Sequence, residues 1–375
     1  MVGWGCGEGP ARLVARVNSS ANAFCHSAMN TSNLSDDSLT AFRATAICRG
    51  LDAVAATQLL ALAEPVSFMA GSRLVRQGEA SRGAFVLRQG TVEARISLPG
   101  GGEKTVAVLE AGSMFGEMAL LEHGYCSASV VASEHVDGWF IEREPFRALT
   151  AGRNPAALAI QRTITFGLVE RLGALNAELH KHPAPEDRPA RELPPDGDPL
   201  LNVPRVRRGA FDHRGFLPIL PFFAGFSPDE IDVVATPAKV LDVARGAWLF
   251  VAGQSAKACY LVVRGAVEAY ALVDGRERRM ALLGPGSLVG YLSVLRDTPH
   301  GAHARARENS TLLELSATQF MSLYNGTSGA EVKTQHAIHR NLLQSLTRSN
   351  SQLSRLVTQA RLSEALQARL MPAGI

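Results

Sequence analysis

Two stretches of the sequence hold the side chains best suited to bind a small ligand. The first is FGEMALLEHGYCSASV, residues 115–130, in which a carboxylate, Glu117, follows a glycine and opens a short apolar run, and a hydroxyl, Ser127, lies further along. A carboxylate can accept hydrogen bonds from the hydroxyl groups of a ligand. The stretch contains two glutamates and neither lysine nor arginine, so an anion would find no cationic partner within it.

The second stretch is LVGYLSVLRDTPHGAHA, residues 288–304. It has Tyr291 where the first stretch has its carboxylate and His300 where the first has Cys126. A tyrosine cannot act as a carboxylate. A histidine with the ordinary pKa of about 6.5 is mostly neutral at physiological pH and substitutes poorly for a permanent cation.

The sequence argues against catalysis. His300 and His303 form H-x-x-H, but there is no Walker loop, no kinase signature and no G-x-S-x-G. The 5 cysteines are an odd number without C-x-x-C spacing, which argues against both a disulfide framework and a zinc site. We therefore expect a non-enzymatic protein of a reducing cytoplasm, with no metal site.

Both stretches belong to an internal repeat. Glycines and apolar residues of the first half recur at a constant offset, which changes by one residue after a hairpin loop that is shorter in the second copy. So long a period indicates duplicated domains rather than a solenoid. The matching pairs are Gly71 and Gly246, Leu74 and Leu249, Gly78 and Gly253, Phe85 and Tyr260, Gly90 and Gly265, Val92 and Val267, Glu93 and Glu268, Gly112 and Gly286, and Gly116 and Gly290.

Short β-prone runs such as GAFVL, TVEARISL and SASVVA, bounded by turn residues, predict a small barrel in each copy. A helical stretch precedes each barrel, and Ser227 and Glu230 have the spacing of a capping box before the second. A longer helix follows each barrel. The expected fold class is mainly β with flanking α: two tandem β-jelly-roll domains, each with short N-terminal helices and a long C-terminal helix.

The predicted domains are residues 46–182 and 216–330. Between them, residues 183–215 form a Pro/Arg-rich linker in which prolines are too dense for a helix or a central strand. Residues 1–45 are rich in Ser, Asn, Ala and Gly and are predicted to be disordered. Residues 331–375 are predicted to form a C-terminal helix.

Both long helices carry an apolar stripe that needs a partner surface. In the second helix the stripe has heptad-like order, with Ser349 inside it. Two alternatives stay open for it: packing on its own barrel, or a homodimer seam. Its members are Leu342, Leu346, Leu353, Leu356 and Ala360.

The signatures G-x-x-L-x-x-x-G-E, F-V-L-x-x-G-x-V and G-x-x-F-G-E-M-A-L-L, on a barrel between short and long helices, resemble the cyclic-nucleotide-binding domain family. This family includes the catabolite-activator-like barrels and those of the regulatory subunit of protein kinase A. The first copy resembles it over about residues 50–180 and the second over about 216–365.

The resemblance implies that Glu117 accepts the ribose hydroxyl and that the backbone of the surrounding turn and strand faces the phosphate. It also implies that Cys126 occupies the position of the phosphate-binding arginine. The ligand implied is cyclic AMP, cyclic GMP or a cyclic dinucleotide, bound weakly for want of that arginine. The remaining ligand-binding residues implied are Gly116, Met118, Ala119, Leu120, Ser127 and Ala128.

The second pocket is expected to be degenerate and blind to cyclic nucleotides. Its marker residues are Gly290, Tyr291 and His300, while Pro299 keeps the family register. No DNA-reading domain fits after either barrel, because the chain beyond Leu323 is taken up by helix. No segment has the length of apolar sequence needed to cross a membrane.

The linker segment RVRRGAF resembles the inhibitory segment of the regulatory subunit of cyclic-AMP-dependent kinase, which reads R-R-x-A-hydrophobic. Arg207, Arg208 and Ala210 would then dock a kinase. In that family the segment precedes the first barrel, whereas here it lies between the two. The alternative is a solvated basic linker.

These observations predict a non-enzymatic regulatory protein whose first pocket senses a cyclic nucleotide and which signals by helix movement or docking to a protein partner. The alternative is a ligand-independent scaffold with both pockets degenerate. The arginine-rich, alanine-rich composition suggests a bacterial source, and the terminal helix suggests a homodimer.

Overall fold

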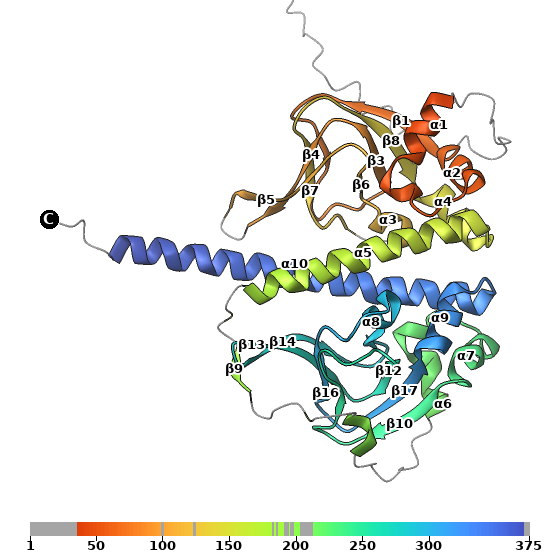
Figure 1. Cartoon of the computed structure of the whole chain (residues 1–375), viewed down its shortest axis with the longest axis vertical. Coiled ribbons are helices and arrows are strands. Elements are labelled where there is room, and N and C mark those ends of the chain that lie inside the picture. Colours follow the sequence, from red (N-terminus) through yellow and green to blue (C-terminus); the bar gives the residue numbers. More distant parts are fainter. Residues whose placement is uncertain are drawn as a thin grey trace, which may run out of the picture.

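The computed structural model describes residues 36–98, 101–122, 125–181, 184, 187–190, 195, 199–202 and 213–370. Two β-barrels lie on opposite sides of a pair of long helices, which run between them (Figure 1). These helices are α5 (Pro155–Lys181) and α10 (Gly329–Leu370). The helix that follows each barrel therefore contacts both halves of the molecule.

The first barrel consists of two four-stranded antiparallel sheets. One has the order β1 (Ala63–Phe68), β8 (Val136–Glu142), β3 (Gly83–Gln89) and β6 (Met114–Phe115). The other has the order β2 (Arg73–Val75), β7 (Ser129–Ala132), β4 (Val92–Ser97) and β5 (Glu103–Leu109). Inward residues such as Leu87, Val92 and Phe115 bury the space between the sheets.

The second barrel repeats this strand order. Its first sheet is β10 (Lys239–Val243), β17 (Ser310–Ser316), β12 (Ala258–Arg264) and β15 (Leu288–Val289). Its second sheet is β11 (Trp248–Phe250), β16 (His303–Ala306), β13 (Val267–Val273) and β14 (Arg276–Leu283), extended at the edge by β9 (Arg188–Pro189). The predicted fold of two tandem β-barrels with flanking helices is confirmed.

The repeated glycines occupy positions that other residues adopt poorly. Gly90 and Gly265 both have a φ of 86°. A Cβ atom at either would lie within 3 Å of a backbone carbonyl oxygen, that of His135 or Asn309. The repeat in the sequence therefore reflects the same turn geometry in the two barrels.

Short helices precede each barrel, as the sequence predicts. Before the first are α1 (Asp36–Arg43), η2 (Ala46–Cys48) and α2 (Ala53–Leu60); before the second are η3 (Pro199–Asn202), α6 (His213–Phe216), η4 (Leu217–Ile219), η5 (Pro221–Phe223) and α7 (Pro228–Ala235). The capping box at α7 is present, because Glu230 N donates to Ser227 Oγ at 3.3 Å and Ser227 N donates to Glu230 Oε2 at 2.7 Å. The remaining helices are α3 (Met118–Leu121), α4 (Arg143–Ala151), α8 (Tyr291–Arg296) and α9 (Ala317–Asn325).

The prediction of disorder up to residue 45 is wrong for its last ten residues. Asp36–Arg43 form α1, and Phe42 is fully buried, with its ring 5.1 Å from that of Trp139 in an edge-to-face contact. Burial of one large aromatic side chain anchors this helix although its sequence is polar. Residues 1–35 lie outside the described residues.

The apolar stripe of α10 packs on α5 of the same chain. Leu342 and Leu346 are buried in one cluster with Ile164 and Leu168 of α5. For these residues the partner is therefore the long helix of the other domain, and a homodimer seam along the rest of the stripe stays a prediction. Ala360, at the end of the stripe, is exposed.

The predicted linker is partly docked onto the second barrel. Asp187 is buried and accepts a bidentate bond from the guanidinium of Arg278, and Arg188–Pro189 pairs with β14. Burial opposes ionisation, but the bond to Arg278 holds the pKa of Asp187 below its usual range.

The kinase-docking candidates Arg207, Arg208 and Ala210 lie outside the described residues. Among the helices of the part that is described, none is long and apolar enough to cross a membrane.

Candidate functional site

Glu117 lies at the start of α3, held there by the turn that precedes it. Gly116 has a φ of 74°, and a Cβ atom at this residue would lie 2.8 Å from the carbonyl oxygen of Gly83. The turn therefore requires glycine. Ala119 and Leu120 are buried and fix α3 to the barrel.

The carboxylate of Glu117 is nearly buried and faces α5. Its side chain is 11% exposed, and Oε1 lies 3.5 Å from Nη1 of Arg171. Arg171 was not among the predicted site residues. The sequence did hold a signal, because Arg171 is a polar residue beside the buried stripe positions Leu168 and Leu172 of a helix predicted to follow the pocket. The structure thus places a cation from the following helix on the predicted ribose acceptor.

Cys126 is fixed by its backbone and leaves its position uncharged. Its N–H donates to Glu79 O at 2.8 Å and its carbonyl accepts from Gly78 N at 2.9 Å. Burial raises the pKa of the thiol, and its hydrogen bond to Ser81 only partly opposes this effect. A neutral thiol stands where the resemblance implies a guanidinium.

Two backbone donors lie next to Cys126. The N–H groups of Ser127 and Ala128 have no acceptor within the described part of the chain. Arg73 lies near this strand, but its guanidinium bonds Glu103 Oε1 at 2.8 Å and Ser129 Oγ at 3.1 Å. The first pocket therefore offers amide donors and a carboxylate, without an uncommitted guanidinium on its strand.

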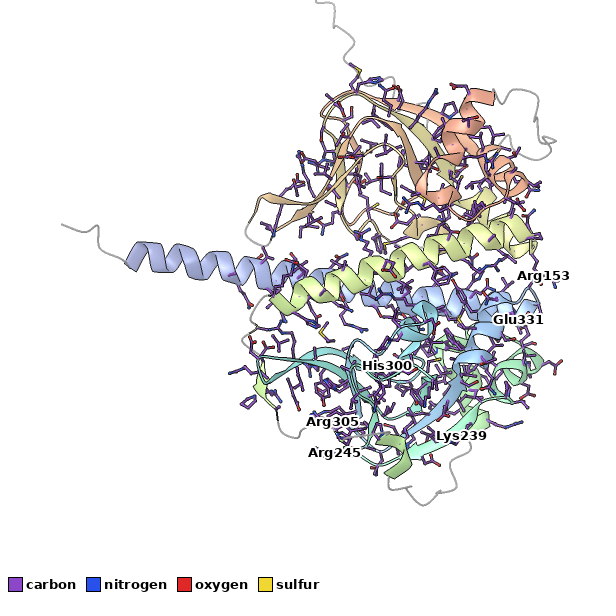
Figure 2. All side chains as sticks on the ribbon, in the orientation of Figure 1. Arg153, Lys239, Arg245, His300, Arg305 and Glu331 are labelled. Atoms are coloured by element: carbon purple, nitrogen blue, oxygen red, sulfur yellow. The ribbon has the colours of Figure 1, made fainter. Side chains whose placement is uncertain are left out.

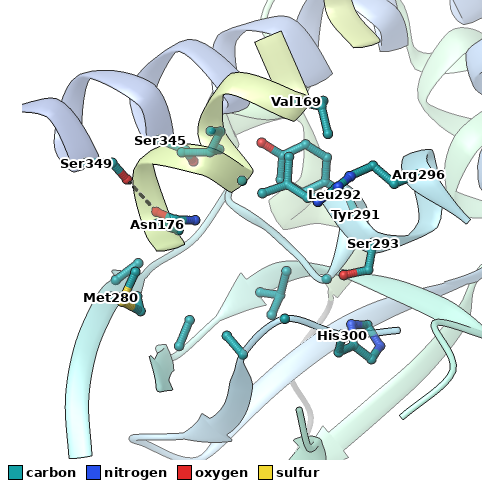
Figure 3. Close-up of a pocket in the computed structure, with 18 of the residues that line it drawn as sticks. Val169, Asn176, Met280, Tyr291, Leu292, Ser293, Arg296, His300, Ser345 and Ser349 are labelled. Carbon is teal, nitrogen blue, oxygen red and sulfur yellow. Dashed lines mark hydrogen bonds between the residues drawn. The ribbon is translucent and has the colours of Figure 1, made fainter. Parts of the chain in front are cut away.

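The structure brings the three marker residues of the second pocket together around a cavity of about 410 Å³. Gly290, Tyr291 and His300 all line it (Figure 3). The ring of His300 stacks on Phe250, with the centroids 3.7 Å apart and an interplanar angle of 10°. Burial lowers the pKa of His300 to about 4, so the ring is neutral at pH 7 and provides no positive charge.

The walls of this cavity come from both domains. Helix α5 of the first domain contributes Asn176 and His180, and α10 contributes Ser345 and Arg348. The barrel contributes an apolar floor that includes Met280. Figure 3 shows the two helices above the cavity and α8 below them.

The buried arginine of this barrel, Arg305, is already paired with two glutamates. Figure 2 places His300 in the middle of the second domain and Arg305 further from α5. Arg305 lies 4.9 Å from the ring centre of Tyr270 and pairs with Glu277 at 3.1 Å and Glu268 at 3.4 Å. The charge of Arg305 is therefore used within the sheet and is not available to a ligand in the cavity.

Within the residues that the structure describes, no three or more His, Cys, Asp or Glu side chains gather as a metal site would require.

The structure thus has two antiparallel barrels in tandem, each with a glycine-led cassette (residues 115–130 and 288–304) and a long helix after it. The model of the cyclic nucleotide-binding domain family matches residues 65–153 and 240–326 of this chain. The chain thus carries two cyclic nucleotide-binding domains in tandem.

Proteins of known name match parts of the chain. The "Cyclic AMP receptor protein" of Thermus thermophilus is 35% identical over 104 residues, which is 28% of this chain and 48% of that protein. A "cAMP-dependent protein kinase regulatory subunit" of Blastocladiella emersonii is 22% identical over 255 residues, 68% of this chain and 50% of that protein. The chain thus spans about half the length of these two relatives.

Two solved structures are also similar to the chain. The regulatory domain of Toxoplasma gondii PKA with cAMP is 17% identical, covers 78% of this chain and 92% of its own, and has a TM-score of 0.29. The regulatory subunit of a cAMP-independent protein kinase A from Trypanosoma brucei is 15% identical, covers 88% of this chain and 97% of its own, and has a TM-score of 0.30.

Proposed function

We propose that this protein is a non-enzymatic regulator in which a cyclic nucleotide binds to the first domain and the signal passes to the second domain through α5. The observation that carries the proposal is the contact between Glu117 and Arg171. It couples the predicted ribose acceptor directly to the helix that the two domains share. The name of the Thermus relative supports a cyclic nucleotide as the ligand class.

The proposed signal begins at the carboxylate. A ribose hydroxyl that donates to Glu117 takes the place of, or reorients, the guanidinium of Arg171, which is 40% exposed and free to move outward. The phosphate is bound by the N–H groups of Ser127 and Ala128 and the turn from Gly116 to Leu120. The contact between Glu117 and Arg171 then differs between the empty and the bound state, and this difference allows the ligand to shift α5.

Helix α5 is suited to transmit this shift because its far contacts lie in the second domain. Thr165 lies 2.8 Å from Nε2 of His339 on α10, and Glu170 pairs with Arg296 of α8 at 2.8 Å. A rotation of α5 must alter these bonds together. The readout is then docking of a protein partner, for which the linker residues Arg207, Arg208 and Ala210 are one candidate.

The affinity should be modest. One missing charge-assisted bidentate contact at Cys126 weakens binding by about 1.5–3 kcal/mol, roughly tenfold to a hundredfold. Cyclic AMP, cyclic GMP and cyclic dinucleotides are the candidates. We place the protein in a bacterial cytoplasm, without DNA binding, with dimerisation through α10.

Calorimetric titration of the full-length protein with each of these ligands tests the proposal. Binding by one of them, weakened at least tenfold by Glu117→Gln and unaffected by Glu144→Gln, is the expected result (about 1.4 kcal/mol per tenfold change). Glu144 is an exposed carboxylate of the same domain. The second candidate function, a ligand-independent scaffold, is favoured by the neutral thiol at Cys126, and it predicts no heat with any of the ligands at millimolar concentration.

A further inference from the structure

The cavity of the second domain lies between its barrel and the two long helices. Its roof is formed by α5 and α10, and its floor by the barrel and α8 (Figure 3). A volume of about 410 Å³ is of the size that binds small organic molecules. Helix α5 of the first domain therefore forms part of the wall of this cavity.

The charges around this cavity are of one sign. Arg296 and Arg348 line it, and no aspartate or glutamate does. Arg296 is neutralised by a bidentate bond to Glu170, with distances of 2.8 and 3.1 Å. Arg348 is half-buried and forms no hydrogen bond or ion pair with any residue that the structure describes. One lining cation is therefore left without a counter-charge.

A buried hydroxyl beside Arg348 also lacks a partner. Tyr291 is 3% exposed and lines the cavity, and its hydroxyl lies beside Ser345 and Arg348 without a hydrogen bond of good geometry to any described residue. In Figure 3 its side chain reaches from α8 toward the helices above it. A buried hydroxyl without a partner is rare in proteins, because the loss of its hydrogen bonds to water is not compensated.

Further donors face the same end of the cavity. Asn176 uses its Oδ1 to accept from Ser349 Oγ at 2.9 Å, which leaves its Nδ2 group available. Nε2 of His180 is buried without a partner, and burial, with the nearby Arg278, lowers the pKa of this ring so that it is neutral. The polar end therefore presents donors, and a ligand must supply the acceptors.

The other end of the cavity is apolar. Residues of the barrel and of α5, among them Val169, Leu172, Phe250 and Met280, form its walls. The position of the ribose carboxylate is Tyr291 and the position of the phosphate guanidinium is the neutral His300. The cavity thus lacks the groups that a cyclic nucleotide needs and keeps an apolar surface with donors at one end.

We propose that this cavity binds a small organic anion with an apolar body, such as an aromatic carboxylate, whose acidic group lies under α10 between Tyr291 and Arg348. The carboxylate accepts from the Tyr291 hydroxyl and pairs with the Arg348 guanidinium. The apolar body lies against the barrel floor. Because α5 contributes the roof, the bound anion holds the two domains together. This inference does not depend on binding at the first pocket.

The test uses the full-length protein with 1-naphthylacetate and its neutral amide, 1-naphthylacetamide, as probes in titrations followed by saturation-transfer NMR. The two probes have the same ring and differ in charge. The acid should bind at least about tenfold more tightly than the amide. Equal binding of the two probes overturns the proposal.

Variants locate the site. Arg348→Gln and Tyr291→Phe should each weaken binding of 1-naphthylacetate, by roughly tenfold for the arginine and severalfold for the hydroxyl. Arg355→Gln removes one charge from the exposed face of the same helix, two turns away, and should leave binding unchanged. Loss of affinity in Arg355→Gln equal to that in Arg348→Gln, or no loss in Arg348→Gln, contradicts the assignment. No binding of the acid at about 5 mM also contradicts it.

Discussion

The side-chain oxygen of Thr165 lies 2.8 Å from Nε2 of His339, which joins the long helix of the first domain to that of the second. Thr165 donates its own proton to Gln161 O at 2.8 Å, so it must accept from His339. The protonated nitrogen of the ring is therefore Nε2. Nδ1 accepts from Gln161 Nε2 at 3.3 Å, and the neutral ring is fully bonded.

This arrangement predicts acid sensitivity. Burial, with smaller effects of His336 and Arg340, lowers the pKa of His339 to about 3. In the unfolded chain the pKa is about 6.5, so the unfolded state takes up the proton first. The neutral His339 ring makes its full contribution to stability above a pH of about 6.5. This contribution is lost as the pH falls toward about 3, and the free energy of unfolding then decreases by up to about 1.4 kcal/mol per pH unit.

Thermal unfolding measured from about pH 7.5 to about pH 4.5 checks this prediction, because this range includes the ordinary histidine pKa of about 6.5. The acid-induced fall in the melting temperature should be smaller in His339→Leu than in the wild type, although the variant starts from a lower value. His135→Leu, at an exposed histidine, should keep the wild-type fall. Parallel curves for the wild type and His339→Leu would show that this ring is not responsible.

The buried, bidentate pair of Asp187 and Arg278 should contribute more to stability than an exposed ion pair does. Asp187→Ala leaves the Arg278 guanidinium buried without its counter-charge, and we expect a loss of about 3–5 kcal/mol. The double variant Asp187→Leu with Arg278→Met should recover most of it, since no charge is then buried. Lys181→Gln, in an exposed ion pair with Glu178, should change stability by less than about 1 kcal/mol. Urea unfolding measures all three; a double variant as unstable as the single one contradicts this interpretation.

Tyr291→Phe should leave the ligand-free protein as stable as the wild type or stabilise it by up to about 1 kcal/mol, because it removes a buried hydroxyl without a partner. Tyr324→Phe is the matched control, because this buried hydroxyl also lacks a hydrogen bond of good geometry and lies beside Thr165, outside the cavity. It should behave in the same way, without any effect on 1-naphthylacetate binding. Marked destabilisation by Tyr291→Phe, seen in urea unfolding, would mean that its hydroxyl is bonded.

The fold could be predicted from the sequence because its constraints are local. The paired glycines, such as Gly90 and Gly265, mark positive φ angles, and the β-prone runs between them give the strands. The role of α5 could not be predicted in this way. Its stripe matches that of α10, but periodicity shows only that a partner exists and not which surface it is.

The candidate sites were predictable only in part. The spacing around Glu117 identified the cassette. Arg171 is distant from Glu117 in the sequence, and only the packing of α5 brings the two side chains together. The second cassette read as degenerate because its charged positions are lost. Its cavity is roofed by Asn176 and Arg348, which lie on two helices outside the cassette. No pattern within residues 288–304 could have revealed them.

Cys126→Arg should restore the missing anion contact of the first domain. Affinity for the cyclic nucleotide should rise by roughly tenfold to a hundredfold, since a guanidinium can bond two phosphate oxygens. Cys126→Gln, similar in size and neutral, should give no such gain. Calorimetry on the two variants distinguishes charge from bulk. An equal gain in both, or none in either, would show that position 126 does not face the phosphate.

The central claim is that a ligand in the first pocket acts on the second domain through α5. Hydrogen exchange of the full-length protein, with and without cyclic AMP, cyclic GMP and cyclic dinucleotides at about 1 mM, tests it most directly. One of these ligands should change exchange in residues 115–122, in α5 around Arg171 and in α10 around His339, and Glu117→Gln should abolish all three changes together. Unchanged exchange in α5 and α10 with every ligand, or changes confined to the cassette, would contradict the account.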